Sequence, residues 1–566
     1  MGERKLAPVK AVKAVAAACQ EAIDTMVEPV DEAMRVNTPG GVFTVRWDQR
    51  GSATALGQLA FFAEYLETTG LFERWLGSCP LSYTSPNAPE LVDVLGTWML
   101  SILDGHCRYA HVGALRGDGV APSILGMNRI IGDDSLRRAL SAIAPAPDAK
   151  HTEAQRAAQQ ARLARSTQWM QDQLKHSIAQ ATEQPWILDC DTTIKVLYGK
   201  QDGAVVSYNP HKPGRPSHAI HTYWIGNLRL VLDAQLEPGN RHSPVHARPG
   251  LMALLEGMPQ AQRPKLVRGD CAFGSEGEMS ALEAIDQPYL FKLRQSAGVK
   301  KLVQRQWTRR DWCSVGQGWE ACEDGLRLTG WTERRRVVVM RRVRKTDLVV
   351  EVKKGGRKSK DQVQAELHFI DENEPVKSWE YAVLVCNAHY ALENIGQLYR
   401  DRADCENGFD EIKNQWGWGG YSTHDIERCA LSARAVALVY NWWSWYVRLA
   451  HPKTRLEAIT SRPKLLSAVG RMTSHGGQKK ILLTITHEAA AQIKALVANV
   501  RHGLQLIRVT APQLTKPERW IALVRYIVER ILACAPKPNL GLTVFSNPGM
   551  SLERPEIDDA KRVDPL

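Results

Sequence analysis

The sequence predicts an α/β protein in which a mixed sheet forms the core and helical regions flank it. Apolar residues recur at helical spacing from Ala55 to Ile143, which predicts a helical N-terminal region. Short β runs follow Trp186, and helices and strands then alternate as far as Arg294. Further strong β runs occur within residues 295–380. We therefore expect an α/β core that is interrupted by a β-rich insertion.

The N-terminal region, residues 1–145, ends in a segment with the pattern of a helix-turn-helix. The run "APSILGMNRIIGDDSLRRALSAI", residues 121–143, combines a short helix, a turn with glycine and a basic second helix that Asp133 is placed to cap. Such a segment suits binding to DNA ends, although the same pattern is common in proteins without DNA contacts. The Ala-, Gln- and Arg-rich residues 146–185 predict a helical connector to the core.

The core is predicted in two parts, residues 186–294 and 381–450. In the first part the strand "WILDCDTTI" leads into an antiparallel meander, after which the strands "PKLVRGD" and "PYLFKLR" alternate with helices. In the second part the strand "WEYAVLVCN" precedes a strongly charged helix. Residues 451–566 are again mainly helical, and one interpretation gives them a role in dimerisation.

The charge of the chain favours a nucleic-acid partner. The 566 residues suggest several domains, and the formal net charge is +12. Most of the excess lies between Lys300 and Lys360, which contains 18 basic and 7 acidic residues. A basic segment of this kind favours a polyanion, although many basic proteins bind none.

The cysteines and the apolar runs indicate a cytoplasmic protein. The 11 cysteines are odd in number and scattered, without a C-x-x-C pair, so neither a disulfide framework nor a zinc site is predicted. The first residues lack the apolar block of a secretory signal, and no uncharged apolar run reaches the roughly 18 residues that span a bilayer. Gly2 is not followed by the Ser or Thr that N-myristoylation requires. We expect no membrane partner.

Three acids stand at or near the ends of predicted strands. Asp189 and Asp191 share one face of the first core strand, because strand side chains alternate, and this strand is expected to end at Thr192 and Thr193. Asp270 ends the strand "VRGD". The sheet holds such carboxylates rigidly while loops leave them open, as in many α/β active sites. Taken separately, each acid is equally well explained as a turn or capping residue.

The segment "YRDRADCENGFDEIK", residues 399–413, gathers reactive side chains. If it is one continuous helix, four of them share an arc of about 60°: Tyr399, Arg402, Glu406 and Lys413. Asp410 joins this face, whereas Asp404 and Glu411 point away and are expected to tolerate alanine. A solvated helix normally spreads its charges over the exposed side, so a shared narrow face suggests a common task.

Two aspartates and one glutamate that converge at one sheet edge suit two Mg²⁺ ions about 3.5–4 Å apart. Carboxylate oxygens are hard ligands that prefer Mg²⁺, and no sulfur or histidine cluster favours zinc. One ion would activate an attacking hydroxyl, and the other would stabilise the leaving oxygen of a phosphodiester. The predicted chemistry is therefore phosphoryl transfer.

The spacing Y-(2)-R-(3)-E-(6)-K of residues 399–413 resembles the signature of bacterial insertion-sequence DDE transposases. "DCDTT" is similar to their first-aspartate motif, in which the Asp directly before Thr-Thr is the ligand, and "VRGDCAF" is a looser match to the second. The separations are 79 residues from Asp191 to Asp270 and 136 from Asp270 to Glu406, and these enzymes often carry a β-rich insertion in the second interval. The resemblance covers residues 186–451 approximately and implies an RNase H-like catalytic core.

The resemblance assigns roles to individual residues. Asp191, Asp270 and Glu406 would be the catalytic ligands of two Mg²⁺ ions, for which Mn²⁺ can substitute. Asp191 is preferred to Asp189, whose exchange is expected to be much milder. Three residues would contact phosphates of the transposon end: Tyr399, Arg402 and Lys413.

Two further groups of residues are candidates for DNA contact. Lys212 and Arg215 in "HKPGRPSH" suit a minor groove, although a plain hairpin turn explains this segment equally well. The insertion contains four tryptophans that could stack on a base flipped out during hairpin formation, although most tryptophans pack in a core: Trp307, Trp312, Trp319 and Trp331. The lysine-rich loop 353–360 is expected to lie on DNA.

The function implied by the resemblance is that of a cut-and-paste transposase, an endonuclease that also joins DNA. It would bind terminal inverted repeats of double-stranded DNA, cleave the ends through a hairpin intermediate and join the 3′-OH ends to target DNA. A homodimer in a synaptic complex, associated with the bacterial nucleoid, is implied as well. Two other interpretations stay open: a host RNase H-like nuclease or resolvase without strand transfer, and a catalytically retired DNA-binding regulator.

Overall fold

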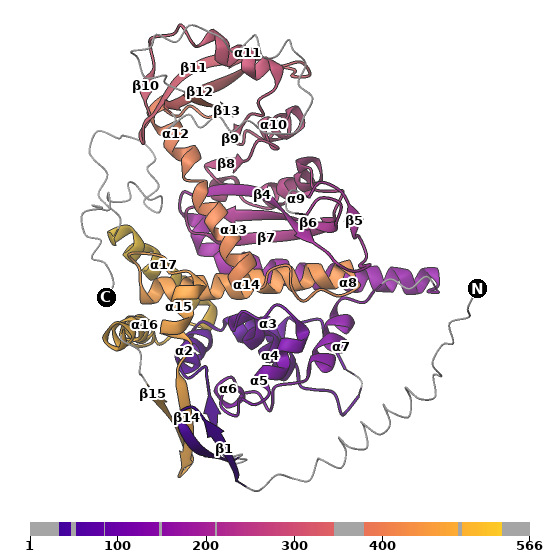
Figure 1. Ribbon diagram of the computed structural model, residues 1–566, viewed down its shortest axis with the longest axis vertical. Helices are drawn as coiled ribbons and strands as arrows, with labels where there is room; N and C mark the ends of the chain where they lie inside the picture. Colours follow the sequence, from indigo (N-terminus) through magenta and orange to yellow (C-terminus); the bar gives the residue numbers. More distant parts are fainter. Residues whose placement is uncertain are drawn as a thin grey trace.

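The computed structural model describes residues 33–46, 52–83, 85–146, 150–209, 212–343, 379–484 and 489–534. Within these residues ten strands form one mixed sheet, and helices pack around it (Figure 1). The predicted mixed α/β class is confirmed. The loop 353–360 lies outside the described residues, as does the β run that precedes it.

The centre of the sheet is β4, which pairs antiparallel with β6 on one side and parallel with β8 on the other. β7 and the short β5 pair with β6, and β9 continues in parallel from β8. The meander and the alternation that follows it are thus present as predicted. In chain order the elements are β4 (Ile187–Val196), β5 (Val205–Val206), β6 (Pro216–Ile225), β7 (Leu230–Pro238), α9 (Pro244–Glu256), η3 (Gln260–Gln262), β8 (Leu266–Gly269), α10 (Glu276–Glu283) and β9 (Tyr289–Lys292).

β4 is longer than the sequence pattern suggested. Thr192 and Thr193 lie within the strand, which continues to Val196 because its antiparallel pairing with β6 is unbroken as far as Ser217. Asp191 therefore stands in the middle of the strand and not at its end. Asp270 directly follows β8, as expected.

The face of the sheet that carries Asp191 is covered by α13 (Ala403–Gln415). Phe409 of α13 packs on Trp224 of β6, with the ring centroids 5.1 Å apart. Trp224 is the register partner of Asp189, so its side chain lies on the same face as those of Asp189 and Asp191. The sheet thus presents its acids toward α13, the helix that carries Glu406 and Lys413.

α14 (Ile426–Ala450) covers the outer edge of β7. The side chain of Asn441 accepts a hydrogen bond from Val231 N at 2.9 Å and donates one to Val231 O at 2.8 Å. An exposed strand edge would offer these groups to other chains, and the asparagine amide satisfies both. The predicted connector helix, α8 (Glu153–Ile178), is present and packs against α14 and β7.

The insertion extends the core sheet. β11 pairs with β12, β12 with β13, and β13 with β9, all antiparallel, so the same sheet continues through the insertion strands. Arg335 of β12 also forms ion pairs with Glu276 and Glu283 of α10, at 2.6 and 2.7 Å. The elements are α11 (Ala297–Arg305), β10 (Cys313–Ser314), β11 (Trp319–Leu326), β12 (Arg335–Val343) and β13 (Trp379–Cys386).

Both terminal regions pack together around α14, at the end of the molecule opposite the insertion (Figure 1). Phe62 of α2 contacts Trp443 of α14, with ring centroids 5.4 Å apart, and Tyr65 of α2 meets Trp520 of α17 at 6.2 Å. β3 also pairs with β14. The N-terminal elements are β1 (Met34–Thr38), β2 (Gly41–Val45), β3 (Ala53–Thr54), α2 (Leu59–Thr69), α3 (Leu71–Gly77), α4 (Leu91–Leu103), η1 (Tyr109–His111), α5 (Val112–Leu115), α6 (Ala121–Ile124) and α7 (Asp133–Ile143), followed after α8 by η2 (Ala179–Glu183).

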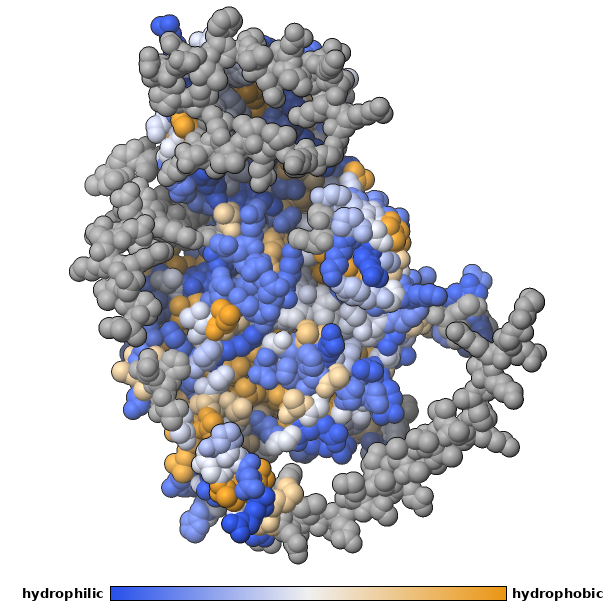
Figure 2. Space-filling model, viewed as in Figure 1, coloured by the Kyte–Doolittle hydropathy of each residue, from blue (hydrophilic) through white to orange (hydrophobic). Residues whose placement is uncertain are grey.

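The terminal regions contain strands that the helical pattern did not predict. β1 pairs with β2, and a second hairpin joins β14 to β15. In Figure 2 apolar and hydrophilic residues alternate at the end of the molecule where β14 and β15 lie. The C-terminal elements are α15 (Ala458–Leu465), β14 (Val469–His475), β15 (Gln478–Thr484), α16 (Ala490–Thr510) and α17 (Lys516–Cys534).

The predicted helix-turn-helix is present only in part. Its first helix, α6, is a single turn, and α7 buries Leu136 and Leu140 in the core. Asp133 is the first residue of α7 and not its cap, because Gly132 occupies the capping position. Its carboxylate instead pairs with Arg137 at 3.5 Å. DNA binding by this segment stays a prediction.

Among the described residues, none of the helices combines the length and the apolar composition that a membrane span requires.

A buried ion pair joins β4, β8 and the helix that follows β13. Both guanidinium nitrogens of Arg268 that face Asp189 donate to its carboxylate, at 2.6 and 2.7 Å, and both side chains are almost fully buried. A third nitrogen of Arg268 donates to the carbonyl oxygen of Leu398 in α12 (Leu392–Arg400). A Cβ at Gly226 would lie 2.1 Å from the Asp189 carboxylate, so only glycine leaves room for this pair.

The pair changes what we expect of Asp189. Asp189→Asn should lower the free energy of unfolding by about 3–5 kcal/mol, because it leaves the charge of Arg268 buried without its partner. Urea denaturation measures this loss. Asp133→Asn removes one partner of an exposed ion pair on α7 and should change stability by less than about 0.5 kcal/mol. A loss below about 1 kcal/mol for Asp189→Asn would contradict the structural role. A milder effect of this exchange on catalysis than that of Asp191→Asn stays a prediction.

Candidate active site

The segment that carries the Y-R-E-K residues is two helices and not one. α12 ends at Arg400 and α13 begins at Ala403. The N–H of Arg402 donates to the Tyr399 carbonyl at 3.1 Å, while the Leu398 carbonyl, which a continuous helix would use, accepts from Arg268. The prediction of one continuous helix over residues 399–413 is therefore wrong. Asp401 and Arg402 nevertheless keep right-handed helical backbone angles, so the direction of the chain changes little.

Arg402 lies between two of the predicted acids. Its Nη2 is 3.4 Å from Oδ2 of Asp191, and its Nη1 donates to Oε1 of Glu406 at 3.0 Å. Arg402 is 6% exposed, whereas the Glu406 side chain is 65% exposed. The backbone N–H of Thr192 also donates to Asp191 Oδ1 at 2.8 Å. The strand acid and the helix acid thus face each other across one guanidinium group.

Asp270 lies close enough to Asp191 to affect its ionisation. Burial raises the pKa of Asp191 to about 6, Arg402 opposes this rise, and the negative charge of Asp270 adds to it. The Asp270 carboxylate accepts a hydrogen bond from Ala272 N at 2.9 Å, which fixes its orientation after β8. Two carboxylates that repel each other in a partly dry site are a feature of centres that bind cations.

Tyr399 and Lys413 border the same site from opposite ends of the segment. Burial raises the pKa of Tyr399 to about 12, with Arg402 lowering it and Asp270 raising it. Desolvation lowers the pKa of Lys413, while Asp191 raises it. The structure thus brings the four signature side chains around Asp191 and Asp270, although they come from two helices. The visible surface over α13 is mainly hydrophilic (Figure 2).

Glu411 is not a solvent-facing residue of α13. It is 1% exposed and forms an ion pair with Arg455. Its carboxylate also accepts hydrogen bonds from Ala458 N at 3.0 Å and from the indole N–H of Trp416 at 3.3 Å. Glu411→Ala is therefore expected to lower stability, because α15 packs on this side of α13, and its effect on cleavage stays a prediction. The side chain of Asp404 lies outside the described residues.

Lys212 and Arg215 lie away from these acids. They stand in the loop before β6, near the end of the β4–β6 pair that contains Val196. Both cations pack over the ring of Tyr198, at 5.1 and 5.6 Å from its centroid, and Lys212 donates to its hydroxyl at 2.5 Å. Tyr198 is 67% exposed, so this loop presents a basic surface with an aromatic ring.

The four candidate tryptophans differ in their surroundings. Three are covered by arginines, with the guanidinium carbon 3.9, 4.7 and 5.4 Å from the ring centroid: Trp312 by Arg341, Trp319 by Arg342 and Trp331 by Arg335. Trp307 is 62% exposed and follows α11. Among the four, Trp307 alone presents a ring that is open for stacking in the described structure.

Two residues on the strands that carry the acids were missed by the sequence analysis. Arg268 positions both β4 and α12, as described above; the signal was its place two residues before Asp270 in "VRGD". Lys195 shares the Asp191 face of β4 by strand alternation. It is half-buried, its ammonium group has no hydrogen bond or ion pair within the described residues, and desolvation lowers its pKa.

Comparison with known proteins identifies the class of this site. A family model described as "Transposase DDE domain group 1" matches residues 90–505. The chain belongs to this family. It is thus a DNA transposase, an enzyme of DNA transposition that binds DNA.

Chains from solved structures also match this transposase, and one of them belongs to a transposase complex with DNA. The structure is a cryo-EM structure of the piggyBac transposase synaptic complex with hairpin DNA, at 11% sequence identity and a TM-score of 0.40. The match covers 87% of this chain and 89% of that chain. No curated protein matches the chain.

The residues of the transposase fit a divalent cation by their chemistry. Within the described residues no three His, Cys, Asp or Glu side chains are gathered closely enough to hold a metal ion. The acids near Arg402 supply only oxygen ligands, the kind that Mg²⁺ and Mn²⁺ prefer. The repulsion between Asp270 and Asp191 that contributes to the raised pKa of Asp191 is the type of charge conflict that a cation relieves.

The raised pKa of Asp191 predicts a trade-off between stability and activity. With a folded-state pKa of about 6 against an ordinary value of 3.8, the ionised carboxylate opposes folding above pH 6 and has no such effect when protonated. Asp191→Asn should therefore melt about 3 °C higher than the parent at pH 8 in EDTA. This difference should shrink between pH 6 and pH 4 and vanish below. An equal or lower melting temperature at pH 8, measured by calorimetry, would contradict it.

Proposed function

We propose that this DDE transposase moves a DNA element by a cut-and-paste reaction. The observation that carries the proposal is the position of Arg402 between Asp191 and Glu406, with Asp270 close enough to raise the pKa of Asp191. These groups come from β4, the end of β8 and α13, and they lie near one another, although no three of the described acids are close enough to hold one metal ion. The substrate would be the terminal inverted repeats of the element, and the 3′-OH ends would be joined to target DNA.

The three acids are proposed to act through divalent cations. Asp191, Asp270 and Glu406 would hold two Mg²⁺ ions, or Mn²⁺ in their place. Bound cations supply charge stabilisation for the attacking and the leaving oxygens of a phosphodiester. Asp191 is preferred to Asp189 because the Asp189 carboxylate is already saturated by Arg268. The order of strands, three antiparallel and then two parallel, supports an RNase H-like core for this chemistry.

The cations around the acids are proposed to hold the DNA strand. Arg402 and Lys413 would bind phosphates next to the scissile bond, with the Tyr399 hydroxyl as a further donor. Lys195 would add a further phosphate contact along β4, since its ammonium group has no acidic partner among the described residues. A phosphate contact fixes the register of the strand as well as adding affinity.

The remaining features of the reaction are proposed on the family resemblance. The ends would be released through a hairpin intermediate, with Trp307 as the stacking candidate because its ring is exposed. Lys212 and Arg215 would contact DNA away from the scissile bond. A homodimer in a synaptic complex would hold two ends, in the nucleoid of a bacterial cytoplasm.

Loss of one acid should abolish the chemistry and leave DNA binding intact. Asp191→Asn and Glu406→Gln are expected to lose Mg²⁺-dependent cleavage and strand transfer, since a missing ligand disrupts the cation site more than it lowers the affinity for DNA. Cleavage of labelled repeat ends, strand transfer of pre-cut ends and gel-shift binding measure the three steps. Full cleavage in either variant would refute the assignment. Cleavage without strand transfer by the parent enzyme would instead favour a nuclease or resolvase.

The signature cations should affect the rate of cleavage more than affinity. Arg402→Ala and Lys413→Ala are expected to slow single-turnover cleavage by on the order of 10²-fold, because a misplaced phosphate moves the scissile bond. Asn407→Ala, an exposed position on α13, is the matched control and should cleave normally. Arg402→Lys should restore little activity, since one ammonium cannot span both acids. If Asn407→Ala slowed cleavage as much as Arg402→Ala and Lys413→Ala, the signature side chains would have no specific role in positioning the DNA.

A further inference from the structure

A basic groove lies in the insertion, away from the acids. It is formed between α11 and the chain that leaves β11, residues 326–329, and its volume is about 890 Å³. Leu328 closes one side of the groove by packing at Gly298, where a Cβ would lie 2.5 Å from the leucine side chain. Glycine at this position therefore lets the loop approach the helix.

The groove is lined by three cations and no acid. Lys301 and Arg305 are one turn apart on α11, and Arg327 faces them from the loop. The ammonium of Lys301 and the guanidinium of Arg305 have no ion pair within the described residues. Arg327 uses only its Nε, which donates to Trp331 O at 3.2 Å. Ser296, Gln304 and Thr329 add polar groups to the lining.

This arrangement differs from that of four arginines on β12 of the insertion. Arg335, Arg336, Arg341 and Arg342 are each paired with a glutamate at 2.6 to 2.8 Å. Within residues 295–343, three cations without an ion pair thus share one groove, whereas Lys300 and Arg310 lie outside it. Phosphate oxygens supply the negative charge and the hydrogen-bond acceptors that such a lining requires.

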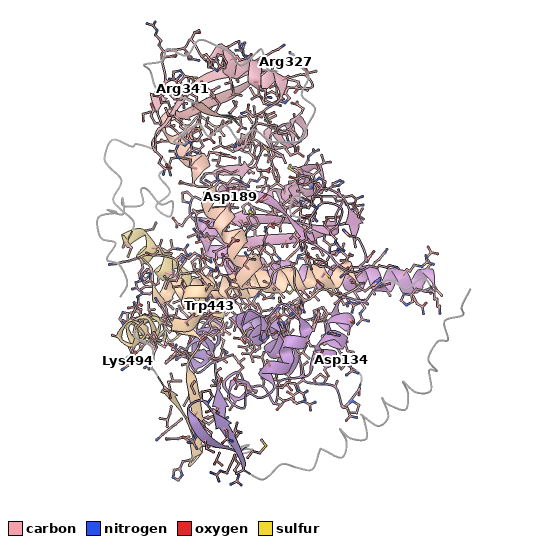
Figure 3. All side chains as sticks on the ribbon, viewed as in Figure 1. Asp134, Asp189, Arg327, Arg341, Trp443 and Lys494 are labelled. Atoms are coloured by element: carbon pink, nitrogen blue, oxygen red, sulfur yellow. The ribbon has the colours of Figure 1, made fainter. Side chains whose placement is uncertain are left out.

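The groove is far from the acids along the sheet. Five strand-to-strand steps separate β4 from β11, and at about 4.8 Å each they amount to about 24 Å. Figure 3 shows Arg327 at the end of the insertion beside α11, well separated from Asp189 on β4. At about 3.4 Å per base pair, 24 Å corresponds to about seven base pairs of duplex.

We propose that this groove binds the phosphodiester backbone of the DNA end about seven base pairs from the scissile phosphate. The contact is independent of base sequence, because the groove offers cations and hydroxyl or amide groups to phosphates and no element that enters a base-reading groove. It holds the arm of DNA that extends across the insertion while the acids act on the cleavage site. The inference rests on the proposed function, since it needs an end positioned at Asp191.

The salt dependence of binding tests the groove. The probe is a repeat-end duplex with long arms, bound by full-length protein carrying Asp191→Asn so that no cleavage occurs. Changing Lys301, Arg305 and Arg327 together to Gln should weaken binding on the order of tenfold and reduce the slope of log K against log salt by about 2.7. Lys301→Gln alone should reduce the slope by about 0.9, and Lys300→Gln, its neighbour outside the groove, should leave it unchanged.

Arm length tests the position of the contact. Shortening the duplex on one side of the cleavage site to fewer than about seven base pairs should remove the difference between parent and triple variant, and shortening the other side should not. A slope that the triple variant leaves unchanged, or a difference that persists when both arms are short, would overturn the proposal. Because all three side chains are solvent-exposed, equal melting temperatures are expected and verify folding.

The outcome is separable from that of the proposed function. An unaltered slope in the triple variant, together with normal cleavage by protein that retains Asp191, would reject the groove alone. Absence of metal-dependent cleavage by the parent protein would reject the function without reference to the groove. Equal loss of binding in Lys300→Gln and Lys301→Gln would also reject the groove, because it would assign the effect to total charge.

Discussion

The buried pair of Asp189 and Arg268 determines where the acids of this transposase lie. It ties β4 to β8, and so fixes the strand of Asp191 against the strand that leads to Asp270. Its third contact takes the Leu398 carbonyl out of the helical ladder and thereby sets the break between α12 and α13. Arg402 stands at that break. One ion pair thus couples β4 and β8 to α12, the helix that leads into the Glu406 helix α13, and Gly226 is the small residue that leaves space for it.

Much of the fold was predictable because local patterns controlled it. The period-two runs after Trp186 became β4, β6 and β7, and the Ala- and Gln-rich connector became α8. Prediction failed where distant partners decided the outcome. The pairing of β14 with β3 could not be predicted because it joins residues more than 400 positions apart, whereas the β14–β15 hairpin is local and was overlooked. Asp133 does not cap α7 because Gly132 occupies the capping position, which a side-chain pattern does not reveal.

The site shows the same division. The acids and the signature cations were found from residue types and spacing, and the structure brings Arg402 against Asp191 and Glu406. The prediction for residues 399–413 assumed one unbroken helix and took the side chains away from the shared face to be exposed to solvent. It therefore missed Arg268, which breaks the helix from outside, and misjudged Glu411, which Arg455 and α15 bury. Sequence spacing identifies side chains that can meet, whereas packing decides which of them are structural.

The joint packing of both ends of the chain has a consequence for its synthesis. Tyr65 of α2 rests against Trp520 of α17, and β3 needs β14 as its partner. The two aromatic residues are 455 positions apart in the chain. At about 5–20 residues per second, roughly 20 to 90 seconds pass on the ribosome before the second reaches the first. The packing of α2 against α17 therefore cannot form until Trp520 has been synthesised, and a product that ends before α17 lacks this part of the core.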